Sequence, residues 1–226
     1  MKGHLLVLVL IGCVAVNVRA YAEPSGERDA DMAVYVLMGE RFEIPTAYLS
    51  SIDKGSRGRT ETGHGHMVFM EVEPETMRPA VAAPRTPQGW QKAIRENVDI
   101  YLRTTDISGF VQRQYAVPVL RRRCQELSPM LSKCPEWSGV WKHEKEALVF
   151  KRPDGTERVF ECDIPRSGLN AYCEIALPMV DHIDLYIRFV RQFLDARDGI
   201  VDRALALVCA FFKPDPARTY TVNHCK

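Results

Sequence analysis

The chain has 226 residues, of which 26% are charged and 46% are hydrophobic, as in an ordinary globular protein. Lysine and arginine number 30 against 29 aspartate and glutamate residues, so the formal net charge is +1. This composition excludes collagen, coiled coils and long disordered chains, and its charge balance argues against a general nucleic-acid binder.

The N-terminal residues have the pattern of a bacterial secretory signal peptide. Lys2 gives the chain a positive start, and residues 5–16 are apolar apart from the Cys13 thiol. About twelve apolar residues are too few for a transmembrane helix, which needs roughly 20, and no later segment is apolar enough to span. The small residues Ala20 and Ala22 are cleavage sites, so residues 1–20 are predicted to be a signal peptide cut after one of them.

An alternative N-terminus remains open. Residues 10–13, Leu-Ile-Gly-Cys, resemble a bacterial lipobox, in which the cysteine is lipidated and becomes the new N-terminus. Cys13 would then anchor the mature chain to the envelope, and the protein would be an envelope lipoprotein.

Export makes the start of the mature chain a testable prediction. N-terminal sequencing of the periplasmic protein is expected to begin at Tyr21 or Glu23, directly after the two cleavage sites. A start at lipid-modified Cys13 would replace this prediction with the lipoprotein alternative, and an intact Met1 would contradict both.

Removal of Cys13 leaves six cysteines, an even number, which in an exported chain indicates disulfides because the periplasm is oxidising. They are Cys124, Cys134, Cys162, Cys173, Cys209 and Cys225. Their spacing favours pairs of nearest neighbours, each worth on the order of 3 kcal/mol in the loop-entropy model. No C-x-x-C is present, so neither a zinc ribbon nor a thioredoxin-type pair is indicated.

The hydrophobic pattern predicts strands and few helices. Alternating or apolar segments predict strands at residues 34–38, 41–44, 66–72, 98–103, 147–151, 157–162, 170–177 and 182–193. The apolar residues of 182–193 also fit a helical spacing, so a helix is the alternative there. The turn signal Pro153-Asp154-Gly155 joins two of them into a hairpin, and Pro178 is expected to end another.

Two segments predict helices. Thr86 and Pro87 mark the start of a short helix that runs to Val98. Near the C-terminus, Asp195 or Asp198 is expected to cap an amphipathic helix that Pro214 stops.

These elements together predict an α+β fold: a mainly antiparallel sheet built from hairpins, with the C-terminal amphipathic helix packed on it. Residues 32–226 are expected to form a single domain, or two subdomains divided near 74–88 or 104–117. No internal repeat is present.

Few residues suggest a catalytic, metal-binding or partner-binding site. His64 and His66 could share a metal ion, but two ligands do not make a site, so no metal or cofactor is predicted. No serine has the G-x-S-x-G spacing of a nucleophile elbow. The basic run Arg121, Arg122 and Arg123 could recognise carboxylates, and Trp137 and Trp141 are candidate anchors of a protein interface. All five residues also suit a purely structural or solvated role.

Residues 39–49, Gly-Glu-Arg-Phe-Glu-Ile-Pro-Thr-Ala-Tyr-Leu, resemble a segment of small exported proteobacterial envelope proteins with the pattern Phe-x-Ile-Pro-x-x-Tyr-Leu. The strand and Pro-rich exit at residues 66–79, and the strand and helix at residues 184–212, are similar too. Some proteins of this group are immunity proteins against toxins of type VI secretion systems. The resemblance carries over no catalytic residue.

The sequence therefore favours a periplasmic, non-catalytic binding protein, an immunity-type inhibitor that occludes a toxin such as a type VI lipase. The alternatives are an envelope hydrolase or metal-binding enzyme with a dispersed site, and a structural envelope lipoprotein.

Overall fold

The computed structural model describes residues 31–50, 58–63, 65–80, 96–105, 121–135, 145–164 and 171–225. The predicted signal peptide, the helix predicted from Thr86, and the side chains of Trp137 and Trp141 lie outside these residues.

Within the described residues, the larger of two sheets has eight strands, and each strand is antiparallel to its neighbours. In spatial order they are β4 (Met67–Val72), β5 (Val98–Thr104), β11 (Ile183–Val190), β10 (Tyr172–Val180), β9 (Glu157–Asp163), β8 (Lys145–Lys151), β7 (Leu131–Pro135) and β6 (Gln125–Ser128). Since β8 to β11 follow one another in both sequence and space, much of the sheet forms from local antiparallel pairs.

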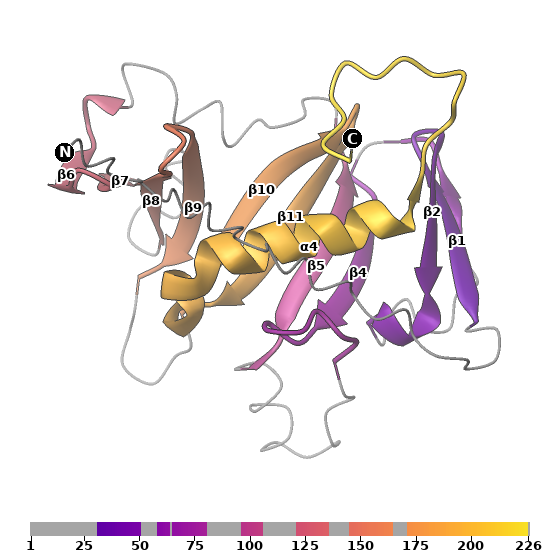
Figure 1. Ribbon diagram of the computed structural model, residues 1–226, viewed down its shortest axis with the longest axis horizontal. Helices are drawn as coiled ribbons and strands as arrows, with labels where there is room; N and C mark the ends of the chain where they lie inside the picture. Colours follow the sequence, from indigo (N-terminus) through magenta and orange to yellow (C-terminus); the bar gives the residue numbers. More distant parts are fainter. Residues whose placement is uncertain are drawn as a thin grey trace, which may run out of the picture.

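The smaller sheet has four strands and lies at the opposite end of the molecule from β6 (Figure 1). Its order is β12 (Phe212–Lys213), β2 (Glu40–Pro45), β1 (Met32–Leu37) and β3 (Thr60–Glu61). Strands β1 and β3 are parallel, and the other neighbours are antiparallel.

The helix α4 (Arg197–Phe211) lies across one face of the large sheet (Figure 1). It follows the short 3₁₀ helix η2 (Arg191–Ala196); a second one, η1 (Thr46–Tyr48), follows β2. Ile200, Val201, Ala204 and Val208 of α4 are buried in a core that also contains residues of both sheets. In β11 the odd positions from Ile183 to Phe189 enter this core, because alternate residues of a strand point to opposite faces.

The predicted α+β class with mostly antiparallel strands is confirmed, and each predicted strand overlaps an observed one. Two details are wrong. Strand β10 continues through Pro178, which lies at a register shift, where the pairing tolerates a residue without an N–H. Neither Asp195 nor Asp198 caps α4: the cap residue is Ala196, and Asp198 in the first turn accepts a hydrogen bond from Arg158, with an Nη1–Oδ1 distance of 2.8 Å.

Three disulfides join neighbouring cysteines of the sequence: Cys124–Cys134, Cys162–Cys173 and Cys209–Cys225. The first closes the hairpin of β6 and β7, and the second links β9 to β10. The third ties the C-terminal tail to α4, and the tail also docks on the large sheet through the backbone N–H of His224, which donates to the carbonyl of Met179.

Among the residues that the structure describes, no helix is long and apolar enough to cross a membrane.

Candidate functional site

The two edges of the large sheet differ in how their backbone is covered. At β4, flanking segments form bridges between Leu49 and Met70 and between Val72 and Pro79. In the described part of the chain, no segment pairs with the outer side of β6. All four residues of β6 are exposed. An edge of this kind presents unpaired N–H and C=O groups on which another chain can form a strand.

The hairpin of β6 and β7 holds this edge in a fixed position. The Cys124–Cys134 disulfide closes it, and the backbone N–H of Lys151 on β8 donates to the carbonyl of Met130 at its turn (3.0 Å). The register of the β6–β7 pair shifts between Glu126 and Ser128. Leu127 is 50% exposed and Met130 44%, so two large apolar side chains face solvent at the edge.

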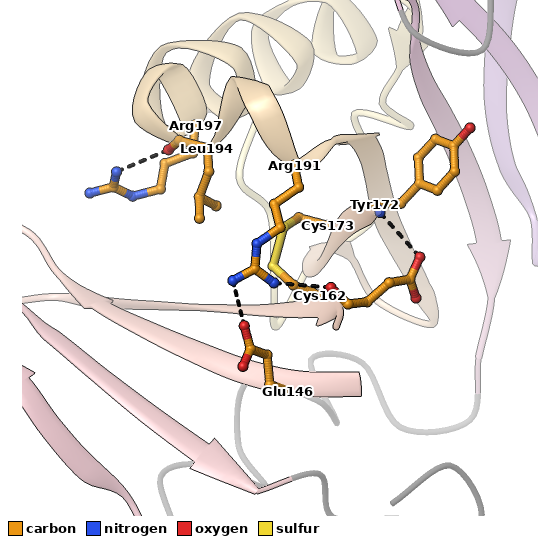
Figure 2. Close-up of a disulfide and its surroundings, with 8 residues drawn as sticks. Glu146, Cys162, Tyr172, Cys173, Arg191, Leu194 and Arg197 are labelled. Atoms are coloured by element: carbon orange, nitrogen blue, oxygen red, sulfur yellow. Dashed lines mark hydrogen bonds and ion pairs between the residues drawn. A yellow bond between two sulfur atoms is a disulfide. The ribbon is translucent and has the colours of Figure 1, made fainter. Parts of the chain in front are cut away.

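A buried ion cluster fastens β7 to the sheet. Glu146 on β8 is 5% exposed and is paired with both Lys133 of β7 and Arg191 of η2. Figure 2 shows Arg191 reaching past the Cys162–Cys173 disulfide to Glu146. Burial by itself raises the pKa of Glu146, but the hydrogen bonds from Lys133 and Arg191 outweigh it and lower the pKa overall. Glu146 is thus an ionised anchor behind the hairpin.

The predicted basic run lies directly before this hairpin. Arg121 is paired with Glu157 at the start of β9. Arg122 and Arg123 are exposed, and within the described residues neither forms an ion pair. Trp137 and Trp141 lie outside the described residues, so their predicted role as partner anchors stays a prediction.

Of the predicted histidine pair, only His66 lies within the described residues. Its backbone N–H donates to the Thr104 hydroxyl (3.0 Å), and its carbonyl accepts from the Thr104 N–H (3.0 Å). Among the described residues, which do not include His64, no group of three His, Cys, Asp or Glu residues could hold a metal ion.

A row of aromatic side chains that the sequence does not reveal lies on the far face, which is the face of the large sheet turned away from α4. Phe69, Tyr101 and Tyr186 occupy paired positions of β4, β5 and β11, with ring centroids 4.4 and 6.4 Å apart. The Arg103 guanidinium lies 5.7 Å from the centroid of the Tyr186 ring. The alternation within each strand places these residues on the face opposite the core residues of the same strand, but only the strand order brings them together.

A row of charges runs beside the aromatic row. Glu71, Asp99, Arg188 and Glu174 occupy paired positions across β4, β5, β11 and β10. Burial raises the pKa of Asp99 to about 6, with the neighbouring carboxylates adding to the effect and Arg188 opposing it. Burial also raises the pKa of Glu174. Besides Arg188, Lys145 and Arg103 also act on Glu174 and oppose the rise of its pKa, so this part of the far face carries charges of both signs.

The raised pKa of Asp99 predicts that this carboxyl opposes folding at neutral pH. Because the folded state binds the proton more readily than the unfolded state, the free energy of unfolding rises as the pH falls through about 6 toward 4. Asp99→Asn is therefore expected to stabilise the protein by about 1–3 kcal/mol at pH 8, and the gain should shrink in acid. Urea unfolding at several pH values measures it.

Asp154 is a control for which the effect of the carboxyl on the free energy of unfolding has the opposite sign. Hydrogen bonds from Thr156 lower its pKa, so its ionised form favours the folded state. Asp154→Asn should reduce stability at pH 8, and this loss should fade in acid. If the stability of the Asp99 and Asp154 variants responded equally to pH, the opposite directions given for the two pKa shifts would be wrong.

Comparison with known proteins finds a similarity of fold but none of sequence. No family model matches the chain, and no curated protein matches it in sequence. Among solved structures, the fold is similar to that of Smlt3025, an immunity protein of the Stenotrophomonas maltophilia type IV secretion system. The TM-score is 0.52 at 15% sequence identity, and the match covers 82% of this chain and 94% of that one.

Proposed function

We propose that this protein is an exported immunity-type inhibitor that binds a toxin of a secretion system and blocks its active site without catalysing a reaction. The observation that carries the proposal is the likeness to an immunity protein, which extends over 94% of that chain. The weak sequence resemblance of residues 39–49 to a group that includes immunity proteins supports it independently.

The three disulfides support both the location and the mode of action. Disulfides form and persist in oxidising compartments, and with the predicted signal peptide they favour the periplasm. They also hold the surface rigid, and a rigid surface loses less conformational entropy when it binds. A specific inhibitory complex would bury roughly 1,600 Å² in total.

The two resemblances suggest different toxins. The sequence pattern favours a type VI effector such as a lipase, whereas the protein of similar fold belongs to a type IV system. A panel of both kinds of toxin, each directed to the periplasm of the same host, distinguishes them. We expect this chain to restore growth against one member only, because immunity proteins must discriminate among partners.

The decisive control tests whether protection depends on export to the periplasm. A variant that lacks residues 2–20 should remain in the cytoplasm and fail to protect, and the purified mature chain should form a stable complex with the same toxin. Failure of the full chain to protect against any toxin in the panel, together with absence of binding, would contradict the proposal.

Catalysis is tested in the same cells. The double variant His64→Ala/His66→Ala should still protect, since inhibition by occlusion needs no histidine pair. Trp141→Ala tests the predicted aromatic anchor and should weaken protection. If the histidine variant folded and bound the toxin but no longer protected, a catalytic function would be the better account.

A further inference from the structure

We propose that the toxin binds at the β6 edge, which we define as Arg122, Arg123, strand β6 and Met130, and that it adds an extended, acidic segment there as a ninth strand of the large sheet. This inference rests on the proposed function and names the surface and the chemistry of the partner.

Of the edge strands in the described part of both sheets, β6 offers the longest uncovered backbone. In the described part of the chain, the β4 edge is covered by bridges to Leu49 and Pro79, and the edge strands β3 and β12 of the small sheet have two residues each. Strand β6 has four residues, all exposed, and no described segment pairs with its outer side. An added strand would satisfy its free N–H and C=O groups, and such main-chain hydrogen bonds supply affinity.

The side chains of the β6 edge favour a protein partner over solvent. Native proteins usually protect an exposed edge with lysine, proline or inward-pointing charges. Strand β6 contains neither lysine nor proline, and its one charged residue is the exposed Glu126. It exposes Leu127 by 50%, and Met130 beside it is 44% exposed. These two apolar side chains can enter pockets of a partner, which is how strand addition gains specificity.

Arg122 and Arg123 determine the charge of the partner segment. Arg121 is neutralised by Glu157, but the other two guanidinium groups have no carboxylate partner among the described residues. Leu127 lies four positions after Arg123, at most about 14 Å away in extended chain, so one short peptide can reach both the charged and the apolar side chains. Guanidinium groups bind carboxylates through paired hydrogen bonds, which favours aspartate or glutamate in the toxin segment.

Contacts behind the β6 edge hold it in an ordered conformation before a partner binds. The Cys124–Cys134 disulfide and the pairing of Lys133 with buried Glu146 hold β7 and β6 in place. A strand that is already ordered pays less entropy on association than a loop that must fold first.

The experiment uses the toxin that the wild-type chain neutralises, measured by calorimetry against four double variants. Arg122→Glu/Arg123→Glu and Leu127→Ser/Met130→Ser are each expected to weaken binding at least about tenfold. The first variant turns an attraction into a repulsion, so added salt should strengthen its binding, whereas added salt weakens binding of the wild type. Met32→Ser/Met67→Ser is the apolar control, since these methionines are 45% and 39% exposed elsewhere. Arg41→Glu/Lys213→Glu, two paired exposed residues of the small sheet, is the charge control. Both controls should bind within about threefold of wild type.

Hydrogen exchange then tests strand addition itself. The amides of residues 125–128 that face outward should become protected in the complex, and thermal unfolding should show that all four variants fold. If wild type binds no toxin, the proposed function fails. If wild type binds and the edge variants bind equally well, or if β6 gains no protection, this inference fails while the proposed function stands. A dimer of the isolated chain that the Leu127→Ser/Met130→Ser variant dissociates would also overturn it, because a second copy would then occupy the edge.

Discussion

Replacing Cys162 and Cys173 together with alanine is expected to lower the free energy of unfolding by about 3 kcal/mol. The disulfide closes a loop with a sequence separation of 11, so its loss gives the unfolded chain more freedom. Both cysteines are fully buried in the main core, and they face each other on β9 and β10, so the variant also loses packing there. Urea unfolding without reductant measures the change.

The Cys209–Cys225 disulfide is the matched control. It has a longer sequence separation of 16, but Cys225 belongs to the C-terminal tail and is only partly buried. Without this bond the tail can detach while the core stays closed, which limits the loss. We therefore expect the Cys209→Ala/Cys225→Ala variant to be the more stable of the two. The opposite order would show that loop length, not position in the core, determines the effect.

The parts of the fold that sequence can predict are those with one buried face. In β5 and β11, alternate residues enter the core, and the amino-acid pattern of residues 98–103 carries that alternation. Residues 182–193 fit both a strand and a helix in sequence; in the structure β11 ends at Val190, and residues 191–193 belong to η2. Strand β6 has no such signal because all four of its residues are exposed. It is a strand because β7 pairs with it and a disulfide closes the hairpin, and neither cause lies in the local pattern.

The candidate site shows the same limit. The basic run at Arg121–Arg123 is visible in the sequence as a charge cluster, but its place beside an open sheet edge depends on the strand order. The sequence pattern places Tyr101 and Tyr186 opposite the apolar residues Ile100 and Leu185 of their strands, yet the two tyrosines become neighbours only because β5 pairs with β11 across a long stretch of sequence. Pairing between distant strands is a property of the whole fold.

Arg218→Ala is expected to destabilise the protein by about 3 kcal/mol, because it leaves a buried carboxylate without its cation. Glu40 at the start of β2 is 1% exposed. Arg218 of the C-terminal tail forms an ion pair with it, and the Tyr220 hydroxyl donates a hydrogen bond to its other oxygen (2.8 Å). These contacts attach the tail to the start of β2, directly after the turn that joins β1 and β2.

The variant Glu40→Gln distinguishes the cost of a buried, unpaired carboxylate from the net contribution of the Glu40–Arg218 ion pair to stability. In this variant Arg218 loses its partner, but its side chain is 35% exposed and can reach water, while glutamine can still accept the hydrogen bond from Tyr220. The loss should therefore be only about 1 kcal/mol, the net value of a typical hydrogen bond. Urea unfolding at neutral pH compares the two variants. Equal losses would mean that the carboxylate gains hydration when Arg218 is removed, and that the tail moves away from Glu40 instead of leaving it buried and charged.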